Sequence, residues 1–194
     1  MRELETIRLR LRPLAAGDRD ALYNIYTERE VSRNLITPPA SIEEFHEPFE
    51  RMLELAPTLG MWAIVRKDDG RLIGRCGFYP CSEPPAGTPE LAYLLSRSDW
   101  GMGLATEAAR RCLDFAFSEQ AWPEVVAMVR RGNGASARVL RKVGMQLVRP
   151  IEVRGVPADL YGLQRTSYVP NEVQPTSSSD IAHESPDARV KVSP

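Results

Sequence analysis

Two glycines stand where a predicted strand passes into a predicted helix, inside the stretch Trp-Gly-Met-Gly-Leu-Ala-Thr-Glu at residues 100–107. An apolar run, 91–95, precedes them, and a helical pattern begins near Leu104. The first turn of a helix has backbone N–H groups without partners inside the helix, and it carries a partial positive charge. Glycine lets an anion come close to such groups. The stretch therefore predicts a binding site for a phosphorylated cofactor.

Two common phosphate-binding motifs do not fit this stretch. A dinucleotide fingerprint would need a third glycine at position 106, where the chain has Thr106. A P-loop would need Gly-Lys-Ser/Thr, which the sequence lacks.

The order of residues in two stretches is similar to a known family. Residues 100–105 resemble the pyrophosphate loop of the GNAT acetyltransferases, Gln/Arg-x-x-Gly-x-Gly/Ala, with Trp100 in place of the first Gln or Arg. Residues 133–145 are similar to the Asn-x-x-Ser-x-x-x-hydrophobic-x-x-x-Gly-Phe/Met segment of the RimJ/RimL-type branch, which is ribosomal-protein N-terminal acetyltransferase-like. The resemblance covers roughly residues 5–166, and the chain is identified on it as a GNAT member of the RimJ/RimL type.

The resemblance implies acetyl-CoA as the acyl donor, held without a metal. Backbone groups of two strand residues would pair with its pantetheine arm, a run of N–H groups would hold its pyrophosphate, and an asparagine would bond to the arm. The implied binding residues are Leu94, Leu95, Gly101, Met102, Gly103, Leu104, Ala105, Thr106 and Asn133. The bland alternatives are a tight turn at the glycines and a loop asparagine tolerating left-handed geometry before Gly134.

The reaction that the resemblance implies is acyl transfer from a thioester to an amine, which needs a base for the amine and an acid for the leaving thiolate. Glu90, at the start of a strand, matches the carboxylate that often serves as base in the family; it could equally be an exposed strand-end residue. Glu152, with Asp159 behind it, is the rival base. Ser136 matches a hydroxyl used as general acid, and it could also simply cap a helix.

The inventory of reactive side chains excludes other chemistry. Only two histidines occur, so a Ser-His-Asp triad or a His-rich metal site is nearly excluded. The three cysteines form no Cys-x-x-Cys pair, so no disulfide framework or zinc site is indicated. Cys112 falls in the apolar stripe of a helix, where a buried structural thiol is expected.

Composition suits one globular domain. The chain has 194 residues, 43% hydrophobic and 26% charged, with a formal net charge of -1, which does not indicate a nucleic-acid binder. No apolar run approaches the roughly 20 residues of a membrane helix. We expect no membrane or nucleic-acid partner and a cytoplasmic location.

Hydrophobic periodicity predicts the elements that position these residues. A capping box at 41–44 opens a helix in which Pro48 predicts a kink or a division into two short helices. Strands are expected at 6–12, 61–65, 72–78, 90–96, 125–129, 145–149 and 160–164, and helices at 18–28, 41–54, 104–119 and 136–143. Together with the resemblance this is an α+β GNAT fold: a mixed, mostly antiparallel sheet of six to seven strands, splayed between 90–96 and 125–129, flanked by about four helices.

Residues 1–169 are expected to form the acetyltransferase domain. Residues 170–194 contain four prolines, five serines and no aromatic residue, a composition typical of a disordered tail.

The predicted function is transfer of acetyl from acetyl-CoA to a primary amine, either a protein N-terminal α-amine or a small molecule, by direct attack in a ternary complex. The alternative is a catalytically silent acetyl-CoA-binding module. The sequence does not choose the acceptor, or between a monomer and a homodimer.

Overall fold

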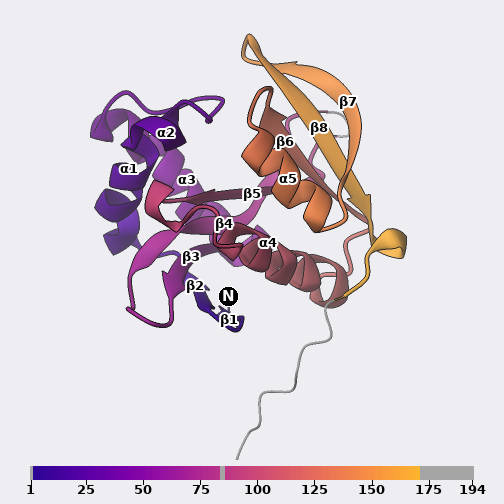
Figure 1. The fold of residues 1–194 in the computed structure, drawn as a ribbon, viewed down its shortest axis with the longest axis horizontal. Coiled ribbons are helices and arrows are strands. Elements are labelled where there is room, and N and C mark those ends of the chain that lie inside the picture. Colours follow the sequence, from indigo (N-terminus) through magenta and orange to yellow (C-terminus); the bar gives the residue numbers. More distant parts are fainter. Residues whose placement is uncertain (1, 84–85, 171–194) are drawn as a thin grey trace, which may run out of the picture.

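The computed structural model describes residues 2–83 and 86–170. The predicted tail lies outside the described residues except for Pro170, so it stays a prediction. The chain builds one mixed sheet of eight strands in the order β1-β2-β3-β4-β5-β6-β8-β7, flanked by helices (Figure 1). The α+β class and the mixed sheet are as predicted, and the expected counts of six to seven strands and about four helices are each too low.

The strands are β1 (Leu4–Glu5), β2 (Leu9–Pro13), β3 (Met61–Arg66), β4 (Leu72–Pro80), β5 (Pro89–Leu95), β6 (Glu124–Arg130), β7 (Gln146–Val153) and β8 (Val156–Gln164). The α-helices are α1 (Arg19–Thr27), α2 (Arg29–Ser32), α3 (Ile42–Leu59), α4 (Leu104–Asp114) and α5 (Gly134–Lys142). A π-helical turn, Phe115–Glu119, continues α4, so the helix predicted at 104–119 corresponds to these two elements together.

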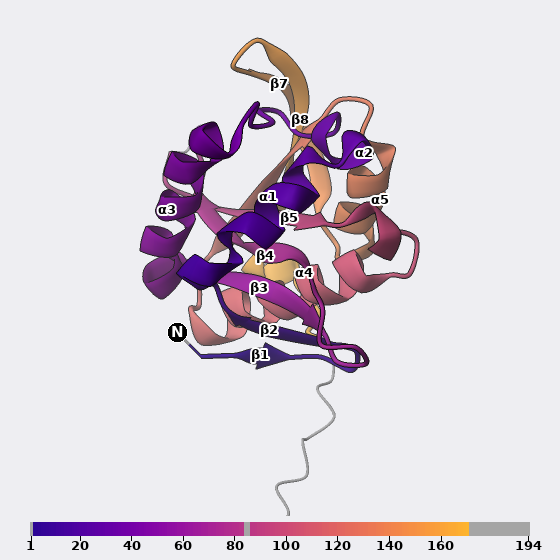
Figure 2. The ribbon, with the colours of Figure 1, turned by 90° about the vertical axis from the view of Figure 1, so that its left-hand side faces the viewer.

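Helices cover the two faces of the sheet. Helices α1 and α3 lie over β3 and β4 on one face, which Figure 2 places towards the viewer, and α4 packs on β4 and β5 from the other. Each face has its own apolar cluster: Phe45, Phe49 and Leu94 belong to the first, and Cys112 and Leu113 to the second. Cys112 is fully buried, as the apolar stripe predicted.

Helix α3 is continuous through Pro48, so the alternative of two short helices is wrong. A proline inside a helix removes one hydrogen bond and costs about 3 kcal/mol. Phe45, Phe49 and Met52 are each 1% exposed or less. Burying one such side chain contributes about 1.5–3 kcal/mol, so the apolar side of the helix outweighs the proline. The start matches the prediction, because Ser41 accepts a hydrogen bond from the Glu44 N–H over 3.2 Å.

The two halves of the sheet meet at a single parallel bridge. Strands β5 and β6 pair only at Glu90 and Val126, whereas β4 and β5 pair along their whole length. Beyond the bridge β5 and β6 separate, which is the splay predicted between residues 90–96 and 125–129.

No helix in the described part of the chain combines the length and apolarity needed to cross a lipid bilayer.

Gly74 is where β4 comes closest to β5. A Cβ at this position would lie 2.0 Å from the Leu94 carbonyl oxygen and 2.9 Å from the Leu95 Cα. We expect Gly74→Ala to lower the free energy of unfolding by about 2 kcal/mol, since both contacts are backbone and cannot swing aside. Urea denaturation measures the change.

The matched control is Gly17→Ala, because Gly17 is exposed and a Cβ there has no neighbour within 4 Å. This variant should stay within about 0.5 kcal/mol of the parent protein. Equal stability of the two variants would contradict the close approach of β4 and β5.

Candidate active site

A cavity of about 660 Å³ opens where β5 and β6 separate. One wall comes from α1, α3 and the segment 31–39, and the other from β6 and α5. The start of α4 forms part of the lining. The cavity thus collects residues from the predicted strand at 90–96, the glycine loop and the segment that begins at Asn133.

The ladder between β4 and β5 decides which backbone groups of β5 face the gap. The Ser96 N–H donates to the Ile73 carbonyl over 2.8 Å. Bonded and non-bonded pairs alternate along an antiparallel ladder, so the backbone groups of Leu94 also point towards β4. Those of Tyr93 and Leu95 point the other way, towards the gap. Of the two strand residues predicted to bind the cofactor, Leu95 therefore offers its backbone to the cavity.

Side chains on β5 alternate between the two faces of the sheet. Leu94 belongs to the cluster under α1 and α3, whereas Leu95 and Tyr93 belong to the cluster under α4. The Glu90 side chain lies on the same face of the sheet as that of Leu94, which follows it by four residues. The gap therefore has a carboxylate on one face of the sheet and a phenol on the other.

The loop 101–103 and the first turn of α4 present free backbone donors. Among the described residues, no hydrogen-bond partner exists for the six N–H groups from Gly101 to Thr106. Gly103 is the N-cap of α4 with φ of 79°, a left-handed conformation that favours glycine. This is the arrangement that the sequence predicted for an anion site.

Three carboxylates anchor this loop. Glu28, at the end of α1, accepts hydrogen bonds from the Ser96 hydroxyl over 2.7 Å and from the Arg97 N–H over 2.6 Å. Asp99 is 1% exposed and bonds to the guanidinium groups of Arg66 and Arg71 at 3.1–3.2 Å. These bonds fix the loop without using the N–H groups that face the cavity.

The third carboxylate is Glu107, in the first turn of α4. It accepts bonds from the Thr6 hydroxyl at 2.5 Å, the Arg8 N–H at 2.9 Å and the Arg8 Nε at 2.7 Å. Arg8 also donates to the Met102 carbonyl over 2.8 Å. Burial would raise the pKa of Glu107, but the bonds from Thr6 and Arg8 outweigh it and lower the pKa. Glu107 therefore stays ionised and ties the loop to the turn between β1 and β2.

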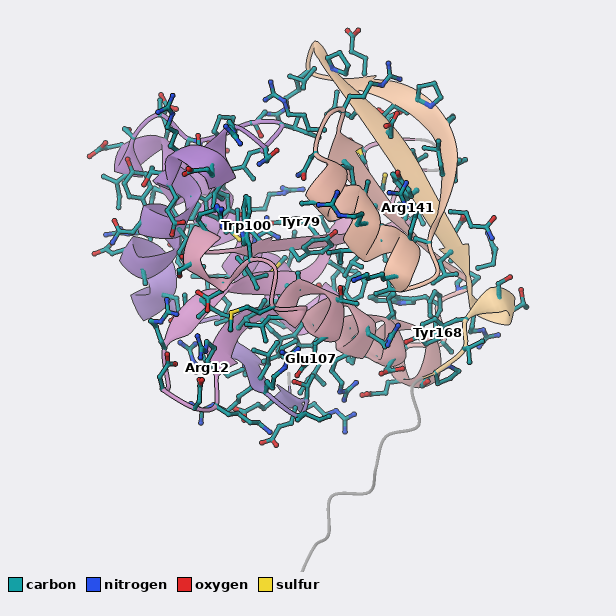
Figure 3. The ribbon with its side chains drawn as sticks, in the orientation of Figure 1. Arg12, Tyr79, Trp100, Glu107, Arg141 and Tyr168 are labelled. Atoms are coloured by element: carbon teal, nitrogen blue, oxygen red, sulfur yellow. The ribbon has the colours of Figure 1, made fainter. Side chains whose placement is uncertain are left out.

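Trp100, where the family loop has Gln or Arg, closes the loop onto β5. Its indole Nε1 donates to the Leu95 carbonyl over 2.9 Å, and the Arg97 guanidinium lies 5.2 Å from its ring. Figure 3 labels Trp100 beside Tyr79 in the middle of the molecule, and both side chains line the cavity.

Glu90 lies in the cavity lining and is largely buried. Burial raises the pKa of Glu90 to about 7, against the lowering effects of the Arg75 guanidinium and a hydrogen bond from the Met128 N–H. A carboxylate of this kind takes up and gives back a proton near neutral pH.

Asn133 and Ser136 lie at the start of α5, across the gap from β5. The Asn133 side-chain oxygen accepts from the Ser136 N–H over 3.0 Å, so Asn133 caps the helix. Ser136 is the third helical residue, which corrects the expectation that it would be the cap. Its hydroxyl lies 2.8 Å from the Tyr93 hydroxyl, which also donates to the Ser136 carbonyl over 3.0 Å.

Tyr93 was missed in the sequence. Burial raises the pKa of the Tyr93 hydroxyl, against the lowering effect of its bond with Ser136, so the phenol keeps its proton at neutral pH. The sequence did offer a signal for Tyr93. It lies two residues before the end of the strand that precedes the glycine loop, and its side chain is on the opposite face from that of Leu94.

Most of the predicted site residues lie together. The cavity lining includes Glu90, Leu94, Leu95, Gly101, Gly103, Leu104, Ala105, Thr106, Asn133 and Ser136. Two do not belong to it: the Met102 side chain is 47% exposed, and Glu152 is exposed on β7. Glu152 pairs with Pro157 in the β7–β8 hairpin.

Basic side chains line the half of the cavity formed by β6 and α5. The lining includes Arg130, Arg138, Lys142 and Arg154. Arg130 also donates to the Leu35 carbonyl over 2.9 Å, which joins the two walls. Within residues 2–83 and 86–170, no cluster of His, Cys, Asp and Glu side chains could hold a metal ion.

Comparison with protein families gives one matching domain model. The model described as "Acetyltransferase (GNAT) domain" matches residues 8–146, which include both sequence stretches and most of the cavity.

Curated relatives come from Bacillus. "Uncharacterized protein YkkB" of Bacillus subtilis is 36% identical over 110 residues, covering 57% of this chain and 63% of that protein. The match thus spans less than two thirds of that relative. "Uncharacterized N-acetyltransferase p20" of Bacillus licheniformis is 29% identical over 168 residues, covering 83% of this chain and 94% of that protein.

Solved structures include close matches in shape. An acetyltransferase from Agrobacterium tumefaciens is 29% identical with a TM-score of 0.74, covering 84% of this chain and 95% of that one. RimL, a ribosomal L7/L12 α-N-protein acetyltransferase solved in complex with coenzyme A, is 19% identical with a TM-score of 0.69. It covers 84% of this chain and 98% of its own, and at this identity the likeness concerns the fold.

Removing the outer anchor of the loop should weaken donor binding. We expect Glu107→Ala to raise the Kd for acetyl-CoA by about tenfold, because the freed loop would have to be ordered on binding. Isothermal titration calorimetry measures the Kd. Glu47→Ala, at an exposed position on α3, is the matched control and should leave the Kd unchanged. The same Kd for Glu107→Ala and the control would show that the loop needs no anchor at this residue.

Proposed function

Because the chain belongs to the GNAT acetyltransferase family, whose members use acetyl-CoA as donor, we propose that it acetylates a primary amine by direct attack in a ternary complex. The observation that carries the proposal is the arrangement around β5: an ionisable carboxylate on one face, a phenol and a hydroxyl on the other, and a gap between them. Membership in the RimJ/RimL-type branch is part of the proposal.

The donor would enter along the loop and the gap. The six free N–H groups from Gly101 to Thr106 would hold its pyrophosphate at the start of α4. The pantetheine arm would pair with the gap-facing backbone of Tyr93 and Leu95 as a partial strand. The Asn133 amide nitrogen, which has no partner among the described residues, would donate to the arm, while its oxygen caps α5.

The base would act from the α1 and α3 side. Glu90, in its ionised form, takes a proton from the acceptor ammonium, directly or through bridging water. The free amine then attacks the thioester carbonyl carbon, a C–N bond forms, and negative charge gathers on the carbonyl oxygen. The gap-facing Leu95 N–H would stabilise that charge, a contact of a kind that contributes roughly 3 kcal/mol.

The acid would act from the α4 and α5 side. When the C–S bond breaks, the thiolate takes a proton from the pair formed by Tyr93 and Ser136. If the Tyr93 hydroxyl donates to the Ser136 carbonyl, the serine hydroxyl donates to the phenol oxygen. In that arrangement a proton leaving Tyr93 would give a phenolate that Ser136 stabilises, so Tyr93 is the donor that we favour.

The activity should follow the ionisation of Glu90. Since only the deprotonated carboxylate accepts a proton, kcat/KM should rise as the pH passes through about 7. In Glu90→Gln this rise with pH should disappear, and kcat/KM at pH 8 should fall by about 100-fold. The measurement is release of CoA thiol from acetyl-CoA with peptides, polyamines, aminoglycosides and amino acids as acceptors.

Glu152→Gln is the companion variant, because Glu152 is the rival base. The assignment of Glu90 predicts that the pH step persists in Glu152→Gln. Loss of the step there, and its survival in Glu90→Gln, would reverse the assignment. Acetyl-CoA binding without thiol release for any amine would refute the proposed transfer.

The acid can be tested by a pair of variants. Tyr93→Phe should lower kcat by about 100-fold and leave the Kd for acetyl-CoA within about twofold, since it removes one hydroxyl and keeps the ring. Ser136→Ala should have a smaller effect on kcat, because Tyr93 retains its proton. A larger loss in Ser136→Ala than in Tyr93→Phe would make the serine the donor. Stopped-flow measurement of thiol release reports kcat.

A further inference from the structure

Arg75, in the middle of β4, is buried with most of its hydrogen-bonding capacity unused. The residue is 7% exposed, and its Nε donates to the Tyr26 hydroxyl over 2.7 Å. No other hydrogen bond leaves the guanidinium within the described residues, and Nη1 is fully buried without a partner. Four of its five N–H donors therefore have no acceptor among the residues that the structure describes.

The surroundings compensate the charge only in part. The guanidinium carbon lies 5.7 Å from the Tyr26 ring centroid and 5.3 Å from that of Tyr79. Aromatic faces attract a cation, but they accept no strong hydrogen bond in place of the missing ones. A buried arginine stays charged, and a buried charge without hydrogen-bonded partners is costly. A leucine or methionine would fill the same space without that cost, so packing does not explain this residue.

Arg75 lines the cavity on the face of the sheet that carries the proposed base. Arg75 pairs with Leu94 and Tyr79 pairs with Glu90 in the same ladder, and all four side chains point to the α1 and α3 side. Burial raises the pKa of Glu90, and the Arg75 charge opposes that rise, so the two groups interact electrostatically. A cation and an ionisable carboxylate thus lie near each other in the half of the cavity where the acceptor would bind.

The other lining residues of this half of the cavity indicate which kind of acceptor fits it. Apart from Arg75, the described lining residues that precede Gly101 include no cation, and several are apolar: Val31, Phe45, Pro48 and Met52. A single guanidinium matches one negative charge, and its planar fork matches a carboxylate. A doubly charged phosphate would need a second cation on this side.

We propose, on the basis of the proposed transfer, that the acceptor is a free amino acid with an apolar side chain, its carboxylate bound by Arg75 and its ammonium group placed at Glu90. The zwitterion places its negative charge at Arg75 and its positive charge at Glu90, so each buried charge gains a partner of opposite sign. Arg75 is then a specificity-determining residue. A peptide N-terminus has a neutral amide carbonyl in place of the carboxylate and would leave the Arg75 charge uncompensated.

The proton and bond changes remain those of the transfer. One ammonium proton passes to Glu90 and the free amine forms the C–N bond. The C–S bond breaks and the thiolate takes a proton from Tyr93. The second proton that the nitrogen loses returns to the Tyr93 phenolate, directly or through water, and Glu90 gives its proton to solvent. The products are an N-acetyl amino acid and CoA, and the carboxylate stays bound to Arg75 throughout.

The first test uses the unmodified protein and matched acceptors. CoA thiol release is measured at pH 8 with L-leucine, L-methionine and L-phenylalanine, and with the carboxamide of each. The carboxamides have the less basic amines and are less protonated at this pH, so amine reactivity alone favours them. We expect kcat/KM to be about 100-fold higher for each acid than for its carboxamide, because the carboxamide lacks the charged hydrogen-bonded contact with Arg75. A tripeptide beginning with leucine and O-phosphoethanolamine complete the panel.

The second test removes the guanidinium. Arg75→Met should reduce the preference for acid over carboxamide to less than about threefold. The Kd for acetyl-CoA should not change, which reports that the variant is folded. Arg19→Met, at a half-buried position on α1 where the side chain is 41% exposed, is the matched control and should keep the full preference. The acid and carboxamide pairs on the unmodified protein decide the proposal even if Arg75→Met does not fold.

The outcomes separate this proposal from the transfer itself. Equal use of acid and carboxamide, or preference for the tripeptide or for O-phosphoethanolamine, would overturn the amino-acid acceptor and leave the acetyltransferase activity established. If no amine in the wider acceptor panel gave CoA thiol release, the proposed transfer would be overturned, and this inference with it.

Discussion

One parallel bridge, between Glu90 and Val126, holds the two halves of the sheet together at the site. Every other feature of the cavity depends on the separation that begins there. Because β5 is fully paired with β4 on one side, its residues beyond the bridge stay extended while no strand pairs with them on the other side. Such an edge is normally covered in proteins. Here it is buried inside a cavity, where an extended ligand can take the place of the missing strand.

The loop before α4 likewise keeps backbone groups free for a ligand. A loop that must bind an anion needs a fixed conformation and free N–H groups, and the two demands compete for the same atoms. In this chain Glu28, Asp99 and Glu107 make their bonds to side chains and to N–H groups outside the cavity-facing run. The anchors themselves are anionic, and each has a guanidinium, hydroxyl or amide partner that keeps its charge from the anion site.

Local patterns predicted most of the elements. Alternation at 9–12 and the apolar run at 91–95 reflect the burial of one or both faces of a strand, so they can be read without knowing the neighbours. The strand predicted from residue 6 begins only at Leu9, and Ile7 is 94% exposed. The strand Leu4–Glu5 was missed because two residues have no periodicity and exist as a strand only through pairing with β2. The same holds for the contacts at the site. Tyr93 meets Ser136 from 43 positions away, and Arg75 meets Tyr26 from 49 positions away. Glu152 and Glu90 look alike in sequence, and only the folded structure shows that Glu90 lines the cavity whereas Glu152 does not.

The strand order at the far edge of the sheet has a consequence for the chain during synthesis. Strand β6 has a single bridge to β5, and its seven-pair ladder is made with β8, which the ribosome produces last among the strands. The β6 wall of the cavity therefore lacks its main support until about residue 164 has emerged. The first half, with its own apolar cluster under α1 and α3, can collapse early, whereas the donor gap becomes complete only when the final strand inserts between β6 and β7.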